Sequence, residues 1–320
     1  MQKIIVSRAG DPNVLELVSS PAPTIGRGQV LVEVEAAGVN YLDVYLRNGV
    51  LGFSQPFTPG LEGVGLVLDV GADADTLKVG DRIAWINHSG SYADQIALPV
   101  EQAIKIPHGF SRANSLLFQG VTAQYLLAEY HTVRPGDVVL VQAAAGGVGQ
   151  ILVQWLKHLG ATVIGTASTE EKLHTIRALG ADYAVNYSGG FLETVLELTH
   201  GRGVDLALDA VGEATFSDSV RALAKRGLAI AYGQASGVAP DVKVYPLIEK
   251  GARVAGATIF VYIEDPAEMQ GRAAAVIQGI AEGWLRMSDT HDFALGDAAS
   301  AHRALETRAS QGKLALIPDR

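Results

Sequence analysis

Three glycines gather in the segment "AAAGGVGQ", where an apolar run ends and apolar residues return at helical spacing. Glycine lets the backbone turn sharply and approach a ligand, and the first turn of a helix attracts phosphate through its unpaired N–H groups. Ala144, Gly146 and Gly149 fill the G-x-G-x-x-G pattern, with alanine in the first place. Gly147 and Val148 lie inside it. The segment predicts a site for a dinucleotide pyrophosphate; the alternative is an ordinary strand-to-helix turn that binds nothing.

The end of the next apolar run bears on which dinucleotide is bound. An NAD site usually carries an acidic residue there, which binds the ribose 2′-hydroxyl. Ser168 stands in that place, and with Glu171 it fits a helix capping box. Lys172 follows, close to the start of the helix, where a cation is unfavourable to the helix itself. A 2′-phosphate facing Lys172 would explain its position, so we expect NADPH; a solvated lysine is the alternative.

A second group of polar residues lies in "GVNYLDVYLRNG". Helical spacing places Asp43 and Arg47 on one face, where they can form an ion pair. Asn40 can cap a helix that begins near Leu42.

Metal ligands are scarce. The chain has no cysteine, and its eight histidines, at 88, 108, 131, 158, 174, 200, 291 and 302, show no close pair. Zinc needs three or four ligands held in a tetrahedron. We therefore expect no metal site, and most histidines at the surface.

Composition excludes several classes of protein. The 320 residues carry a net charge of −9, which disfavours nucleic-acid binding through a basic surface. Hydrophobic residues make up 48 % of the chain, enough for a sizeable core, and no apolar run approaches the ~20 residues of a membrane helix. The start, "MQKIIVSRAG", has no long apolar stretch typical of a signal peptide. A soluble cytoplasmic protein that acts on a small molecule is expected.

The pattern of expected secondary structure changes along the chain. Residues 1–118 are rich in short strands bounded by glycines. Residues 119–258 alternate strands with helical patterns, which predicts a doubly wound parallel sheet in an α/β protein. The expected strands are 137–142, 162–167, 183–186, 204–209, 228–232 and 253–257, and "TEEKLHTIRALG" is expected to form a helix that ends at Gly180. Residues 259–320 hold a helix around 266–284 and the strand-like "KLALIP", and are expected to return to the first domain.

Several motifs together resemble the zinc-independent quinone oxidoreductases, the zeta-crystallin-like group of the medium-chain dehydrogenase/reductase superfamily. They are "AAGVNYLDVYLRNG", "PGLEGVG", "LKVGDRIAW", "FQGVTAQYLL", "AAAGGVGQ", "DAVG" and "RASQGKLALIP". The resemblance implies a GroES-like catalytic domain (1–118), a Rossmann domain (119–258) that binds NADPH, and a C-terminal segment (259–320). It also implies a reaction in the cleft between the two domains and a homodimer formed through the edge of the Rossmann sheet.

The resemblance further implies roles for single residues. Lys172 and Tyr187, fifteen positions apart, match a pair that binds the 2′-phosphate. Residues that match positions near the rest of the cofactor are Asn40, Thr122, Gly233 and Ser236. Tyr45 matches a tyrosine of the substrate cleft and is expected, with Asn40, to donate a hydrogen bond to the substrate. As alternatives, Asn40 caps a helix and Tyr187 is a half-buried strand end.

Zinc-dependent relatives place a cysteine near Asn40 or Tyr41 and a histidine where Leu61 precedes Glu62. Without a Lewis acid, alcohol oxidation is disfavoured. The expected activity is hydride transfer from NADPH to a quinone or to an activated alkene of the enone, enal or acrylate type. The alternative is a pyridine-nucleotide-binding protein with a structural or RNA-binding role and little turnover; the acidic charge argues against RNA.

The chain departs from the bacterial quinone reductases in two places. Leu51 stands where they often have a second tyrosine, and "ATIFVY" replaces an arginine–proline pair. A more apolar pocket follows, which puts a quinone in doubt as the physiological substrate.

Overall fold

The computed structural model describes residues 1–307 and 312–319. The first four residues of the "RASQGKLALIP" segment therefore lie outside the described residues. Contacts divide the chain into two compact units. Unit 1 comprises Met1–Phe118, Ile263–Ile277 and Met287–Arg320, and unit 2 comprises Gln119–Tyr262 and Gln278–Arg286. In the part of the chain that is described, no helix is long and apolar enough to cross a membrane.

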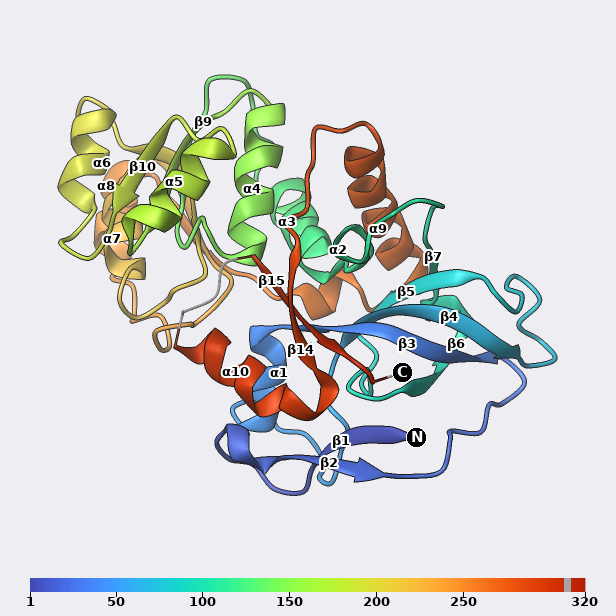
Figure 1. Cartoon of the computed structure of the whole chain (residues 1–320). Coiled ribbons are helices and arrows are strands. Elements are labelled where there is room, and N and C mark those ends of the chain that lie inside the picture. The colour runs from blue at the N-terminus through green and yellow to red at the C-terminus, as the bar shows by residue number, and fades with distance from the viewer. Residues whose placement is uncertain (308–311, 320) are drawn as a thin grey trace. The chain divides into compact units, whose positions relative to one another are not determined.

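Unit 1 is built around a seven-stranded sheet with the order β14-β15-β3-β4-β5-β7, in which β6 also pairs with β3 (Figure 1). Its strands are β3 (Gln29–Val39), β4 (Glu62–Val70), β5 (Arg82–Ile86), β6 (Gln95–Pro99), β7 (Ile104–Lys105), β14 (Thr290–Ala294) and β15 (Lys313–Ile317). A separate antiparallel pair joins β1 (Gln2–Val6) to β2 (Leu15–Ser19). The long strand β3 alternates buried valines with more exposed residues along its first half, as expected for a half-buried strand.

Short helices complete unit 1. They are α1 (Tyr41–Arg47), α2 (Arg112–Ser115), α10 (Ala298–Glu306) and the 3₁₀ turns η1 (Pro12–Val14), η2 (Val100–Gln102) and η4 (Leu295–Asp297). Asn40 is the N-cap residue of α1, and its backbone N–H donates to Asp43 Oδ2 (2.8 Å). The prediction that Asn40 begins a helix is confirmed.

The C-terminal segment differs from the sequence-based expectation. Helix α9 (Pro266–Ala281) ends three residues before the predicted end. Strand β14 and helix α10 were not predicted. The strand "THDFA" has three polar residues in five, and the apolar face of the short helix α10 is made mostly of alanines, so neither stands out in the sequence as an apolar run. The strand expected in "KLALIP" is confirmed as β15.

Unit 2 contains a six-stranded parallel sheet with the order β10-β9-β8-β11-β12-β13. Its strands are β8 (Val138–Val141), β9 (Thr162–Ala167), β10 (Tyr183–Asn186), β11 (Val204–Asp209), β12 (Leu223–Ala231) and β13 (Arg253–Gly256). All six expected strands are present, and β12 begins five residues early. Counted along the chain the order is 3-2-1-4-5-6, the arrangement of dinucleotide-binding sheets, in which the strand order reverses between β8 and β11 while all strands stay parallel.

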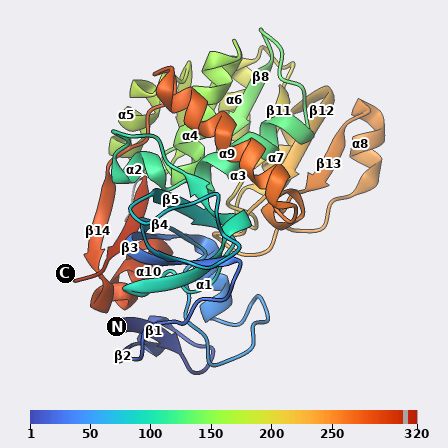
Figure 2. The same ribbon diagram turned by 90° about the vertical axis from the view of Figure 1, so that its right-hand side faces the viewer.

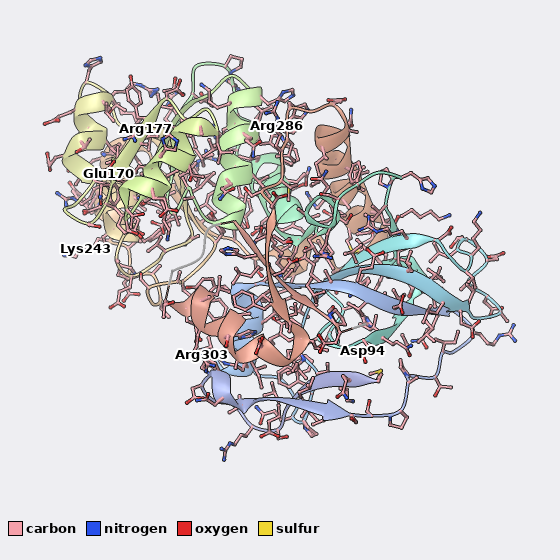
Figure 3. The ribbon with its side chains drawn as sticks, viewed as in Figure 1. Asp94, Glu170, Arg177, Lys243, Arg286 and Arg303 are labelled. Atoms are coloured by element: carbon pink, nitrogen blue, oxygen red, sulfur yellow. The ribbon has the colours of Figure 1, made fainter. Side chains whose placement is uncertain are left out.

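Helices connect these strands. They are α3 (Phe118–Glu129), α4 (Gly147–His158), α5 (Glu170–Ala178), α6 (Leu192–Leu198), α7 (Phe216–Arg221), α8 (Val244–Lys250) and the turn η3 (Ile259–Tyr262). Figure 3 labels Glu170 and Arg177 on α5, where the acid lies in the first turn and the base in the last, as the helix dipole favours. Gly180 follows α5 with φ +99°, so the predicted glycine stop is confirmed.

Candidate functional site

The turn between β8 and α4 forms the first part of the candidate site. Gly146 is the N-cap of α4, and no side-chain hydrogen bond caps this helix end. A Cβ on Gly149 would lie 2.7 Å from Ala144 Cα and would also collide with the Ala143 carbonyl oxygen, so only glycine allows helix and strand to approach this closely. The α4 N-terminus therefore presents backbone donors at the end of β8, where the sheet order reverses and a dinucleotide pyrophosphate would fit.

The other residues of the turn divide by exposure. Ala144 is fully buried, and its N–H donates to the Thr166 carbonyl (2.9 Å). Gly146, Gly147 and Val148 are partly exposed. At Gly147 the Gln119 side chain occupies the place that a Cβ would take. Gly146 and Gly147 are therefore accessible from outside, whereas Ala144 fixes the turn to the interior.

A buried carboxylate, which sequence reasoning missed as a site residue, organises the strand ends beside this turn. Asp209 ends β11 and is fully buried. It accepts from the Gly212 N–H (3.0 Å) and the Ser219 hydroxyl (2.7 Å). The Gln142 amide donates to the same Ser219 hydroxyl (3.1 Å), and the Thr166 hydroxyl donates to Gln142 (2.5 Å). One network therefore ties together the ends of β8, β9 and β11. The "DAVG" motif marked this position without revealing its partners.

The residues expected at the 2′-phosphate lie at the ends of β9 and β10. Asn186 is in register with Ala167, and the Tyr187 N–H donates to the Ala167 carbonyl (3.1 Å). Tyr187 therefore lies next to the chain just before Ser168. Lys172 is half-buried in the first turn of α5. Parallel pairing thus brings Ser168 and Tyr187 to the same edge of the sheet, and α5 starts at that edge.

The predicted capping box of Ser168 with Glu171 is wrong. Thr169 is the N-cap residue of α5, because its hydroxyl accepts from the Lys172 N–H (3.3 Å). Serine and threonine are both preferred N-cap residues, so residue type alone did not identify Thr169. The shift makes Lys172 the third residue of the helix.

The loop after β12 holds Gly233 and Ser236. A Cβ on Gly233 would lie 2.6 Å from the Ala210 carbonyl oxygen, so this glycine allows the two loops to touch. The Ser236 hydroxyl donates to the Val211 carbonyl (2.8 Å) and accepts from the Ala214 N–H (3.0 Å). Its side chain therefore holds the loop after β11. Thr122 lies on α3 and is buried.

In unit 1, antiparallel register brings Asn40 together with two charged residues. Val39 of β3 is in register with Leu314 of β15, and Ala37 with Gly63 of β4. The residues that begin β15 and β4, Lys313 and Glu62, therefore flank the end of β3. Asn40 Nδ2 donates to Glu62 Oε2 (3.0 Å), and Lys313 Nζ donates to Asn40 Oδ1 (2.9 Å) and to Glu62 Oε2.

Glu62 and Lys313 are buried and were not singled out as site residues by the sequence. The other oxygen of Glu62 accepts from the Phe118 N–H (2.7 Å). An acidic residue between two glycine-flanked apolar runs, in "PGLEGVG", was the only available signal for Glu62.

The predicted Asp43–Arg47 ion pair is wrong. Arg47 instead makes a bidentate ion pair with Glu306 of α10 (2.6 and 3.1 Å). Asp43 faces inward and is fully buried. The spacing rule assumes that both side chains share an exposed helix face, whereas this face is packed against the rest of unit 1.

The expectation of surface histidines fails at His302, which is fully buried. Burial, followed by the Arg47 charge, lowers the pKa of His302 to about 3, so the ring is neutral at pH 7. Arg47 Nη1 lies 3.3 Å from Nδ1, and since arginine only donates, Nδ1 accepts and Nε2 carries the hydrogen. Nε2 then donates to the Tyr92 hydroxyl (3.0 Å), which also interacts with Asp43.

Tyr45 lies on α1 and is half-buried. Its ring is tilted against that of Tyr41 at 5.9 Å between centroids, and its carbonyl accepts from the Leu51 N–H (3.0 Å). The residue that replaces the second tyrosine therefore adjoins Tyr45 through the backbone.

Comparison with known proteins gives matches along the whole chain. Residues 26–141 match the model of the alcohol dehydrogenase GroES-like domain, and residues 147–276 match that of zinc-binding dehydrogenases. The 2-haloacrylate reductase of Burkholderia is 38 % identical, with 99 % of each chain covered. The quinone oxidoreductase of Pseudomonas aeruginosa is 35 % identical, again with 99 % of each chain covered. The structure of Escherichia coli quinone oxidoreductase complexed with NADPH has a TM-score of 0.94, at 32 % identity and with 99 % of this chain and 100 % of that chain covered.

The description "zinc-binding" does not fit the residues at this site. Across residues 1–307 and 312–319, no group of three or more His, Cys, Asp or Glu side chains could hold a metal ion. Leu61 is buried where a histidine ligand would stand, and the carboxylate of Glu62 is already paired with the Lys313 ammonium. A second cation next to that ammonium would be repelled, and no thiolate or imidazole is there to hold it.

The buried Asp43 generates a prediction about stability. Burial raises the pKa of Asp43 to about 7 from its ordinary 3.8, against the opposing effects of the Asn40 N–H and Lys313. The folded protein therefore keeps a proton on Asp43 between about pH 4 and 7 that the unfolded chain releases, and this stabilising contribution is lost as the pH rises through that range. Asp43→Asn removes the titration. Its free energy of unfolding, relative to wild type, should therefore increase from about pH 5 to pH 8 in urea titrations.

Asp69→Asn, a change at an exposed carboxylate of β4, is the matched control and should run parallel to wild type. If Asp43→Asn also runs parallel to wild type, Asp43 does not titrate in this range.

Proposed function

This chain belongs to the quinone oxidoreductase family of the medium-chain dehydrogenase/reductase superfamily, and on that premise we propose that it is an NADPH-dependent reductase. Its substrate is a quinone or an activated alkene of the enone, enal or acrylate type. The observation that carries the proposal is the glycine turn, with no side-chain cap on α4, at the point where the unit 2 sheet reverses order. Full-length similarity to a 2-haloacrylate reductase and to quinone oxidoreductases supports the substrate class.

In this proposal unit 2 binds the cofactor and unit 1 supplies the groups that meet the substrate. The α4 N-terminus and Gly146 hold the pyrophosphate, and Lys172 with Tyr187 holds the 2′-phosphate. The proposed domains are a catalytic domain at 1–118, a cofactor-binding domain at 119–258 and a C-terminal segment at 259–320. When bound, NADPH supplies a hydride. Tyr45 and Asn40 donate hydrogen bonds to the substrate oxygen, which gains negative charge as the hydride reaches carbon, and a proton from water completes the product.

The proposed reaction needs no metal. Its support is the set of residues around Glu62, where Asn40 and Lys313 bond the carboxylate that a metal would need as a ligand. A substrate that is already electrophilic needs no Lewis acid for hydride addition, unlike the oxidation of a simple alcohol.

A homodimer is also proposed. β13 is an edge strand of the sheet, and α8 lies next to it (Figure 2). Three exposed apolar side chains of α8 are Val244 (65 %), Tyr245 (71 %) and Ile248 (67 %). An edge strand with apolar neighbours fits a second copy of this chain, which would extend the sheet.

In sedimentation experiments the wild-type protein should be a dimer and Ile248→Asp should be a monomer. A wild-type monomer would contradict the proposal. The cytoplasmic location stays a prediction.

The function is tested by initial rates with a panel of quinones, enones, enals and 2-haloacrylates, with NADPH and with NADH, and with simple alcohols in the presence of NADP⁺ and of NAD⁺. We expect NADPH oxidation with at least one electrophilic class, no alcohol oxidation, and rates that survive dialysis against a chelator. NADPH binding without turnover of any compound would favour the alternative, a nucleotide-binding protein with a structural role.

In the same assay Tyr45→Phe should lower kcat/KM by about 5- to 150-fold, because one donor to the transition state is lost.

Preference for NADPH is tested at Lys172. Lys172→Ala should weaken NADPH binding by roughly 10- to 150-fold, because a charge-assisted hydrogen bond to phosphate is lost, and should leave NADH binding nearly unchanged. Fluorescence titration measures both constants. Removing a cation from the first turn of α5 does not weaken the helix, so a loss of binding is not a folding effect.

Lys225→Ala, at an exposed lysine of β12, makes the same change in net charge and is the matched control. Equal losses for NADPH and NADH in Lys172→Ala would show that Lys172 does not bind the 2′-phosphate.

A further inference from the structure

The carboxamide of Asn40 is held at both of its ends by buried charges. Its Nδ2 donates to Glu62 and its Oδ1 accepts from Lys313, at 3.0 and 2.9 Å. Glu62 is fully buried and Lys313 is 4 % exposed, so solvent does not compete for either bond. Lys313 begins β15, Glu62 begins β4, and Asn40 directly follows β3, which lies between those two strands. Strand register therefore sets their relative positions.

The chemical types of the two partners allow only one orientation of this amide. A carboxylate only accepts hydrogen bonds and an ammonium only donates them. Turning the Asn40 amide by 180° would place its oxygen against Glu62 and its NH₂ group against Lys313, which loses both bonds and adds two repulsions. One N–H of Nδ2 is used by Glu62, and the direction of the second is therefore set as well.

Space for the ion pair is provided by a glycine on β3. A Cβ on Gly38 would collide with Glu62 Oε2 and would lie 2.8 Å from Lys313 Cε. Gly38 is in register with Ala315 of β15 on one side of β3, and β4, which carries Glu62, lies on the other side. The pair therefore fills a place that any larger residue at 38 would close, and this packing limits how far Glu62 and Lys313 can move.

We infer that Lys313 and Glu62 are positioning residues for the proposed reduction: they fix the Asn40 carboxamide so that its second Nδ2–H is aimed in one direction, as a donor to the substrate oxygen that gains charge. The inference rests on the proposed function and deepens it. Neither charged residue need touch the substrate. A donor that is already oriented costs no reorganisation when the charge develops, and a displacement of about 1 Å lowers a rate by roughly 100-fold.

The test separates orientation from stability by comparing two variants. Lys313→Met leaves Glu62 as a buried charge without its counter-charge and should lower both stability and kcat. Glu62→Gln/Lys313→Met removes both charges, so the free energy of unfolding should return close to wild type. The introduced glutamine keeps its oxygen on the Phe118 N–H and therefore turns its NH₂ group toward Asn40, while the introduced methionine neither donates nor accepts, so Asn40 is no longer held in its native orientation. In this double variant kcat should stay about 10- to 100-fold below wild type while KM and the Kd for NADPH hold.

Two further variants keep the test independent of folding losses. Lys313→Arg retains a cationic donor and should recover most of kcat. Gly38→Ala changes no charge but pushes on the pair, and should lower kcat without changing KM. Glu35→Gln is the matched control: it breaks a partly buried ion pair with Arg82 farther back on β3 and should leave kcat unchanged.

The outcomes distinguish this inference from the proposed function. A kcat that recovers together with stability in Glu62→Gln/Lys313→Met, or a wild-type kcat in Gly38→Ala, means that the pair only supports the fold and overturns the inference alone. A wild-type protein that reduces no quinone or alkene overturns the proposed function, and the inference with it.

Discussion

The fully buried carboxylate of Glu62 is the constraint on which unit 1 depends. A buried charge must be paired and hydrogen-bonded, and breaking such a pair costs about 3–5 kcal/mol. Each of its oxygens is satisfied by a different part of the chain: Lys313 and Asn40 bond one, and the Phe118 N–H bonds the other. The requirement explains why β15, drawn from the end of the chain, lies beside β3, and why β3 carries a glycine at position 38.

Unit 2 also contains a buried carboxylate, but its hydrogen-bond partners are neutral. Asp209 is as deeply buried as Glu62, but hydroxyl and backbone N–H groups surround it, and no ion pair to it is present in the described chain. Its network ties the loop after β11 to the strand that carries the glycine turn. A turn supported in this way needs little reorganisation when a phosphate binds, which lowers the entropy lost on binding. In both units a buried carboxylate fixes the geometry of groups that the proposed reaction uses.

Short-range patterns predicted much of this molecule. The central strands β8, β9 and β11 of unit 2 are buried along nearly their whole length and stand out in the sequence as apolar runs, and the glycine turn follows from the residues themselves. Errors arose where distant segments decide the outcome. Arg47 pairs with Glu306 and not with Asp43, and His302 is buried against Tyr92, although more than 200 positions separate each pair along the chain. No periodicity encodes such contacts. The cap at Thr169 was missed for a local reason, since Ser168 fits the same motif.

The central claim is direct hydride transfer from NADPH to an electrophilic carbon of the substrate. NADPH deuterated at C4 of the nicotinamide, on one face and then on the other, tests it by incubation with an enone or 2-haloacrylate and NMR of the product. We expect one of the two cofactors to deliver a full deuterium to the β-carbon, while the α-carbon or the oxygen takes its hydrogen from water. Deuterium that appears in neither product, or that exchanges with solvent before reaching carbon, would contradict the account.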